Sequence, residues 1–144
     1  MHRLLVAVDG SQQAERAVRY LIGLIRDGGL LGGDGEVHLI NVQCAPSSKI
    51  KSSIPAAELD RYFQGQSDDA CRVAENLLRA EGVTFQRHDR KGPAVETIVE
   101  CAQELRCDSI LMGTHGAGFI SGMFMGSVAN KVIHLTEGPV TLVK

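Results

Sequence analysis

Short apolar runs alternate along this chain with longer segments whose apolar residues have helical spacing. The first run, residues 3–8, ends at Asp9-Gly-Ser11, and helical spacing follows through residue 26. A run that is apolar at nearly every position is typical of a strand buried on both faces. The expected strands are Arg3–Val8, Glu36–Val42, Val83–His88, Ser109–Met112 and Pro139–Val143, and the expected helices are Gln12–Arg26, Glu58–Ala80, a helix from Pro93 through Ala102, and Gly126–Leu135.

This order predicts one α/β domain, residues 1–144, with a doubly wound, mostly parallel five-stranded sheet of the Rossmann-like, adenine-nucleotide-binding type. Because parallel crossovers are right-handed, helices should cover both faces of the sheet. In such sheets ligands bind beyond the carboxyl ends of the strands, where the strand order reverses. If the order is 3-2-1-4-5, that point lies between the first and fourth strands. Asp9 and Gly113 should then face one crevice.

Composition argues against several classes of function. The formal net charge is −2, and the densest basic stretch, Arg87–Lys91, is expected to be a strand end and solvated loop, so no nucleic-acid partner is expected. No apolar run approaches the ~20 residues that span a bilayer, and the N-terminal run is short for a signal peptide. We therefore expect a cytoplasmic protein with no membrane partner.

The four cysteines, at positions 44, 71, 101 and 107, have no metal-site spacing and form no C-x-x-C motif. Neither a metal held by clustered side chains nor a disulfide framework is expected. Cys71 and Cys101 fall within helical patterns and are expected to be buried thiols.

Residues 44–57 are rich in Ser and Pro and have no periodicity. We expect a loop here, long enough to act as a lid or to contact a partner. In the helix that follows, Val73, Leu77 and Leu78 are expected to face inward, and Gly65 is a candidate break or kink.

A glycine-rich segment follows the fourth expected strand. It reads Gly113-Thr-His-Gly116, nine residues, then Gly126-Ser127 at the start of the last helix. Glycines let the backbone approach an anion, and free N–H groups at a helix N-terminus point toward it. Strand, glycine loop and helix in this order predict a phosphate site. A tight crossover whose glycines serve packing alone is the alternative.

The residues present favour holding a phosphate over transferring it. Residues 9–14 do not match G-x-G-x-x-G, and no G-x-x-x-x-G-K-[ST] occurs. Between Gly113 and Asn130 only His115 can carry positive charge. Backbone N–H groups, the helix dipole and the Ser127 hydroxyl would hold the phosphates, together with a divalent cation such as Mg²⁺. Slow hydrolysis is expected at most.

Two residues of this region have alternative interpretations. Asp9 can cap the first helix instead of contacting a ligand, and the two roles are compatible. His115 is expected to bond to backbone or solvent, with a general-base role as the alternative. Ser11 lacks a G-x-S-x-G elbow, so it is not expected to be a hydrolase nucleophile.

Three segments resemble the universal stress protein family: Val6-Ala-Val-Asp9-Gly-Ser, Gly113-x-x-Gly116-x9-Gly126-Ser127, and Gly138-Pro-Val-Thr-Leu-Val. The resemblance covers essentially the whole chain, and the loop has the form found in the ATP-binding branch. It implies a sheet of order 3-2-1-4-5, a cytoplasmic location and homodimers joined through the last strand.

By position, the resemblance also implies the contacts of a bound nucleotide. Asp9 would lie at the adenine and ribose end, and the backbone around Val42 would flank the adenine. The rest of the site would comprise Met112 and Gly113 near the ribose and first phosphate, and Gly116, Gly126, Ser127 and Val128 around the phosphates. Two departures remove a hydroxyl and a positive charge: Ala129 stands where some members have a hydroxyl residue, and residues 118–122 lack the Lys or Arg that many members carry.

The last expected strand, Pro139–Val143, is apolar and lies at the predicted edge of the sheet. Exposed apolar edges pair with other chains, and a twofold-related copy is the simplest partner. We expect an antiparallel homodimer through this strand.

Residues and resemblance together favour a cytoplasmic stress-response protein that binds an adenine nucleotide, ATP or AMP. As a homodimer it would sense or store nucleotide state for an unidentified protein partner. Two alternatives remain open. One is a dimeric interaction module with an empty cleft that acts through residues 44–57, and the other is an ATPase or nucleotidyl transferase on the same fold.

Overall fold

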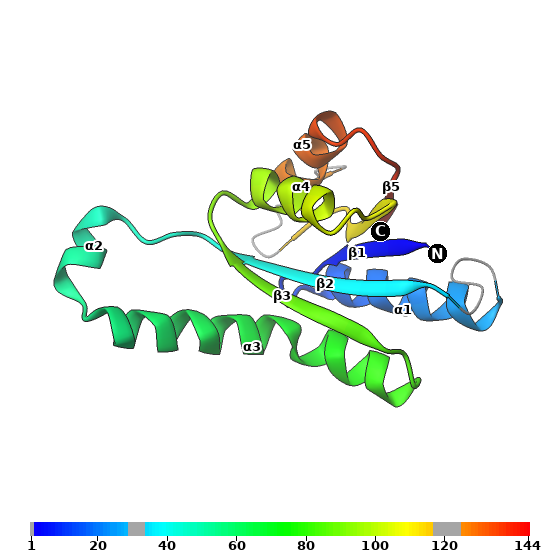
Figure 1. Cartoon of the computed structure of the whole chain (residues 1–144), viewed down its shortest axis with the longest axis horizontal. Helices are drawn as coiled ribbons and strands as arrows, with labels where there is room; N and C mark the ends of the chain where they lie inside the picture. The colour runs from blue at the N-terminus through cyan, green and yellow to red at the C-terminus, as the bar shows by residue number, and fades with distance from the viewer. Residues whose placement is uncertain (1, 29–33, 117–124) are drawn as a thin grey trace.

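The computed structural model describes residues 2–28, 34–116 and 125–144. Its centre is a five-stranded sheet in the order β3-β2-β1-β4-β5, and every neighbouring pair of strands is parallel (Figure 1). The predicted fold class and strand order are therefore confirmed. The segment 118–122 and part of the turn near residues 32–35 lie outside the described residues. None of the described helices combines the length and apolar character that a bilayer span requires.

Strands and helices alternate, apart from two consecutive helices after the second strand. The strands are β1 (Arg3–Ala7), β2 (Glu36–Gln43), β3 (Phe85–Lys91), β4 (Ser109–Gly113) and β5 (Val140–Val143). The helices are α1 (Gln12–Arg26), α2 (Ser48–Ser53), α3 (Ala56–Ala80), α4 (Ala94–Glu104) and α5 (Ser127–Leu135).

Helices cover both faces of the sheet, with α1 and α3 on one face and α4 and α5 on the other (Figure 1). Successive side chains of a strand point to opposite faces. β1 therefore contributes Leu4 and Val6 to the core beneath α1 and α3, and Leu5 to the core beneath α4 and α5. All three are at most 2% exposed. The apolar run in this central strand is explained by burial on both faces.

The register of the central strands brings two carboxyl ends together. β1 pairs with β2 through Ala7 and Ile40, and with β4 through Val6 and Leu111. The segments that follow β1 and β4 therefore leave the sheet side by side. Strand order reverses between these two strands, which is where open α/β sheets form their ligand crevice.

Residues 44–57, predicted to be a loop, contain a helix, so that prediction was wrong. α2 covers Ser48–Ser53, and α3 begins at Ala56, before the predicted Glu58. The Ser47 hydroxyl caps α2 by accepting the N–H of Ile50 at 3.4 Å. α2 buries no side chain. A helix without a buried face has no apolar periodicity, so the residue pattern did not predict it.

α3 is continuous through Gly65, so the candidate break is not realised. Leu78 is fully buried and Leu77 partly buried, as predicted. Val73 is 47% exposed, which contradicts its prediction as an inward residue. The buried face of α3 includes two polar residues instead, Ser67 and Glu75, and both have hydrogen-bond partners.

β3 is an edge strand with a polar sequence, and it extends further than the predicted Val83–His88. Its pairing with β2 starts at Phe85 and continues to Lys91. The basic stretch Arg87–Lys91 is therefore strand throughout, and its expected loop portion is not found. An edge strand exposed along one side tolerates charged residues at positions where a central strand would not.

Arg87 joins β3 to α3 through carboxylates. Its guanidinium donates to Glu75 at 2.8 Å, to Asp68 at 2.7 Å and to Asp89 at 2.9 Å. Glu75 is only 8% exposed, so this pairing explains how a carboxylate is accommodated on the buried face of α3.

All four cysteines are free. Cys71 and Cys101 are buried, as predicted, Cys107 is half-buried and Cys44 is exposed. Burial raises the pKa of the Cys71 thiol to about 12 and that of Cys107 to about 11. These two thiols are protonated at neutral pH and are therefore poor nucleophiles.

Candidate functional site

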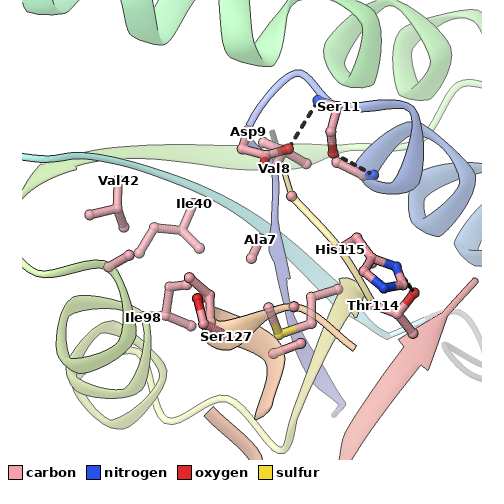
Figure 2. A pocket seen from close by; sticks show the side chains of 18 residues that line it. Ala7, Val8, Asp9, Ser11, Ile40, Val42, Ile98, Thr114, His115 and Ser127 are labelled. Carbon is pink, nitrogen blue, oxygen red and sulfur yellow. Dashed lines mark hydrogen bonds between the residues drawn. The ribbon is translucent and has the colours of Figure 1, made fainter. Parts of the chain in front are cut away.

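A cleft of about 340 Å³ opens at the carboxyl edge of the sheet (Figure 2). It lies between the ends of β1, β2 and β4 and the first turns of α4 and α5. Its volume is within the range of small-molecule sites. The cleft occupies the position where strand order reverses, so topology alone explains its place.

The cleft brings together the eight residues expected to contact a nucleotide. Its lining includes Asp9, Val42, Met112, Gly113, Gly116, Gly126, Ser127 and Val128. The crevice expected between Asp9 and Gly113 is therefore present. The contacts of these residues with a ligand remain predictions.

Sequence reasoning included Val42 but missed the rest of the apolar wall of the cleft. Ile40, Val42 and Ile98 lie together along one side, with Ala7 nearby (Figure 2). Ile40 precedes Val42 by two residues, and side chains two apart share a face of a strand, so this signal was available. Ile98 comes from α4, whose approach to the strand ends is a tertiary feature with no local signal.

Asp9 lies at the end of β1 and shapes the turn into α1. Its Oδ1 atom accepts the backbone N–H of Ser11 at 2.9 Å. The Ser11 hydroxyl in turn accepts the N–H of Ala14 at 3.1 Å and caps α1. Asp9 is therefore not the helix cap, and that alternative was wrong. Its carboxylate is held in the cleft wall by the turn.

Two glycines allow the segment after β4 to pass close to its neighbours. A Cβ atom on residue 113 would lie 2.7 Å from the Cβ of Gln13 and 2.9 Å from its backbone carbon. A Cβ on residue 116 would lie 2.5 Å from Oδ2 of Asp9. Contacts this short exclude a side chain unless the neighbour moves. The packing of β4 against α1 therefore requires glycine at residue 113, whereas at residue 116 a side chain would displace the Asp9 carboxylate.

The N-terminus of α5 forms the opposite wall. Gly126 is the N-cap residue and has no side chain to satisfy the first N–H groups of the helix. These groups have no partner within a helix, and they combine with the helix dipole to favour an anion. Ser127 and Val128 from this first turn line the cleft. A backbone-amide surface thus lies across from the carboxylate of Asp9.

Thr114 connects the cleft to the edge of the sheet. Its carbonyl accepts the N–H of Gly126 at 2.6 Å, and its own N–H donates to the carbonyl of Val143 in β5 at 2.9 Å. Its hydroxyl lies 2.9 Å from Nδ1 of His115. His115 therefore has a neighbouring hydroxyl as one partner, and its expected bond to backbone or solvent stays a prediction.

A buried amide supports the end of β1. Asn41 is 1% exposed, and its Nδ2 group donates to the carbonyl of Val8 at 2.8 Å. Its Oδ1 atom accepts from the Ser67 hydroxyl at 3.0 Å and from Gln43 at 2.9 Å. The network joins β1, β2 and α3 directly behind Asp9. A polar residue between the apolar residues Ile40 and Val42 was the sequence signal for it.

The described lining contains one carboxylate, Asp9, and one imidazole, His115, and it contains no Lys or Arg. No group of three or more His, Cys, Asp or Glu side chains gathers among the described residues in a way that would hold a metal. Backbone N–H groups are thus the main donors that this part of the chain offers to an anion.

The universal stress protein family model matches residues 1–144. A universal stress protein from Thermus aquaticus is 37% identical over 147 residues, covering 98% of this chain and 97% of that protein.

Solved structures of the same family share the fold. Universal stress protein UspA from Lactobacillus plantarum superimposes with a TM-score of 0.79 at 18% identity, covering 99% of this chain and 97% of that one. A universal stress protein in complex with cAMP superimposes with a TM-score of 0.69 at 22% identity, covering 99% of this chain and 97% of that one. The universal stress protein from Archaeoglobus fulgidus in complex with dAMP superimposes with a TM-score of 0.67 at 23% identity, covering 100% of this chain and 98% of that one.

Proposed function

Because this chain belongs to the universal stress protein family, we propose that its cleft binds an adenine nucleotide, with ATP as the first candidate and AMP as the second. The observation that carries this proposal is the division of the cleft into an apolar wall and a backbone-amide wall. An adenine ring suits the first and phosphate groups suit the second. The cAMP and dAMP complexes of two structural relatives support this class of ligand.

We assign the adenine ring to the wall formed by Ile40, Val42 and Ile98. Ile40 is buried and Val42 is partly buried, so the ring would complete an apolar surface that is already largely dry. Asp9 lies at the end of the neighbouring strand, where its carboxylate can accept hydrogen bonds from ribose hydroxyls.

We assign the phosphates to the N-terminus of α5 and the glycines that face it. Gly113, Gly116 and Gly126 keep the backbone close to the ligand, and Ser127 adds a hydroxyl. The Ser127 hydroxyl is a hard oxygen donor on the phosphate side of the lining, and it suits Mg²⁺ bound together with phosphates and water. The cation would supply positive charge that the lining lacks.

We propose binding without fast turnover. Rapid phosphoryl transfer depends on cations that stabilise charge developing on the transferred group, and the described lining has no Lys or Arg. Hydrolysis slower than ordinary enzyme turnover, about 1 per second or more, is consistent with this lining.

We propose that the protein senses or stores nucleotide state as a homodimer formed through β5. This edge strand pairs only with β4 within the described sheet, and Val140, Leu142 and Val143 are partly exposed. Thr114 bonds both to this strand and to the N-cap of α5, so the edge and the cleft share one residue. Four free cysteines suit a reducing compartment, and we propose the cytoplasm.

Acid extraction of the purified protein tests this proposal directly. We expect released ATP or AMP, identified by chromatography, and binding heat when nucleotide-free protein is titrated with ATP and Mg²⁺. Protein that releases no nucleotide and also gives no heat would refute the proposal. Sedimentation at micromolar concentration checks the dimer separately, and a monomer would contradict it.

A further inference from the structure

One part of the molecule packs against almost nothing. We call residues 44–62 the arm: it comprises the linker after β2, all of α2 and the first turns of α3. None of its side chains is buried, and the first buried residue beyond it is Phe63. The arm projects past the end of the sheet (Figure 1). Such a segment has few contacts to lose when it moves.

The arm starts at the mouth of the cleft. Val42 lines the cleft and β2 ends at Gln43, so the arm leaves the sheet at the edge where the proposed ligand binds. Lys49 follows Val42 by seven residues, a stretch of chain that reaches roughly 23 Å when extended. α2 is therefore within reach of the cleft opening.

The charges of the arm and of the cleft are complementary once a nucleotide is bound. The part of the arm next to the cleft, residues 44–57, contains Lys49 and Lys51 and no Asp or Glu; Glu58, Asp60 and Arg61 follow in the part that belongs to α3. Residues 113–130 contain no Lys or Arg, and the described lining has none either. A polyphosphate held there would carry charge that backbone N–H groups and one cation only partly offset. Arg90 and Lys91 pair with Val42 and Gln43 in the sheet, and the nearest Lys or Arg residues along the chain from Val42 are the two on α2.

Gly65 supplies a weak point at the base of the arm. It lies inside α3, two residues after the buried Phe63, and a Cβ at this position would meet no atom within 4 Å. Packing therefore does not require glycine, although glycine weakens a helix relative to alanine. One ion pair, between Asp60 and Lys91 at 3.0 Å, holds the arm to β3, and both side chains are largely exposed. Exposed pairs of this kind break easily.

We propose that the arm is a lid that closes over the occupied cleft, bending near Gly65 and bringing Lys49 or Lys51 to the phosphates of a bound nucleoside polyphosphate. This inference rests on the proposed function. It makes the two lysines determinants of phosphate number, because the lid gains contacts from ATP that adenosine cannot provide.

Titration calorimetry of the full chain with ATP·Mg²⁺ and with adenosine tests the lysines. We expect Lys49→Ala combined with Lys51→Ala to weaken ATP binding about tenfold, as for the loss of one strong charge-assisted contact, and to leave adenosine unchanged. The single variants identify which lysine acts. Arg26→Ala combined with Arg72→Ala removes the same charge from exposed sites outside the arm and the cleft lining, and should change neither affinity.

Two glycine variants test the bend. Gly65→Ala should weaken ATP binding about threefold, because a stiffer α3 resists closure. Gly23→Ala is the matched control, since Gly23 also lies inside a helix with no atom within 4 Å of the added carbon. It should leave ATP affinity unchanged. Hydrogen exchange of residues 44–62 should slow when ATP is added to the wild-type protein.

The outcomes separate the lid from the nucleotide site. Wild-type protein that binds ATP, with unchanged affinity in the double lysine variant and unchanged exchange in the arm, overturns the lid alone. Wild-type protein that binds no nucleotide overturns both proposals. Protection of the arm that rises with protein concentration in the absence of ATP would show that a second copy covers it, and would also overturn the lid.

Discussion

Gly116 approaches Asp9 so closely that a Cβ on residue 116 would lie 2.5 Å from the Oδ2 atom of that carboxylate. The contact joins the segment after β4 to the turn after β1. Both residues line the cleft, so a methyl group at residue 116 would displace the Asp9 carboxylate from its place in the lining.

Gly116→Ala should therefore displace the Asp9 carboxylate while leaving the core intact. We expect ATP affinity to fall at least tenfold, about 1.4 kcal/mol, with little change in the free energy of unfolding. Calorimetry and urea unfolding measure the two quantities. Gly138→Ala is the control, because its added carbon would meet an ordinary contact at 3.5 Å outside the cleft. Equal affinity in the two variants would contradict the role given to this contact.

Gly126→Val should abolish nucleotide binding. A Cβ at this position would already lie 3.2 Å from the carbonyl oxygen of Thr114 and 3.3 Å from the Cα of His115. Both neighbours are backbone atoms, so valine would push α5 away from the loop and disperse its N–H groups. Gly126→Ala should have a smaller effect in the same direction. Acid extraction reports the bound nucleotide and circular dichroism reports the fold. A folded valine variant that retains nucleotide would argue against α5 as the phosphate site.

The C-terminal ends of two helices allow a pair of substitutions with opposite expected effects on stability. α3 and α4 both end in the Schellman pattern, with the left-handed position occupied by Gly82 (φ 70°) in one and by Arg106 (φ 54°) in the other. Arg106→Gly should stabilise the protein and Gly82→Ala should destabilise it, each by about 1 kcal/mol. Urea midpoints measure both. A shift of the same sign in the two variants would show that the backbone conformation is not the cause.

Acid should weaken the packing of β2 against β3. His38 Nδ1 lies 3.0 Å from His88 Nε2, and His38 Nε2 lies 3.4 Å from Glu36. Burial, then the neighbouring His38 and Arg90, lower the pKa of His88. Glu36 is paired with Arg3, and Asp89 acts in the opposite sense on His88.

A lowered pKa means that the folded state favours the neutral imidazole. The resulting stability is fully present above the ordinary histidine pKa of about 6.5 and is lost as the pH falls through the lower folded value. The free energy of unfolding should thus fall as the pH is lowered from 7 to 5. His88→Gln should flatten this dependence, whereas His134→Gln, at an exposed helix end, should not. If the free energy of unfolding has the same pH dependence in the wild type and in His88→Gln, His88 is not the titrating group.

Local patterns predicted most of the fold, and the errors share a cause. The strands and the cleft residues at their ends follow from apolar runs and the glycine spacing. Val73 was placed inward because it is apolar, yet α3 buries Ser67 and Glu75 instead. Ser67 bonds to Asn41, and Glu75 pairs with Arg87. Those partners come from β2 and β3, so nothing near Val73 in the sequence reports them.

The same reasoning explains the part of the site that sequence could not supply. The glycines and the Asp9 turn are local features, and their spacing can be read directly from the amino-acid sequence. Ile98 enters the cleft because α4 crosses above the strand ends, and α2 forms without any buried face. Packing between distant segments decides where Ile98 lies, and α2 has no apolar pattern that would predict it.

The distribution of the four thiols gives the molecule a built-in attachment point for a spectroscopic reporter. Burial raises the pKa of Cys71, Cys101 and Cys107, while Cys44 is exposed at the start of the arm. A maleimide dye at neutral pH should therefore label Cys44 first, without any engineered residue. The natural chain thus places its most accessible sulfur where a fluorophore would register what happens at the mouth of the cleft.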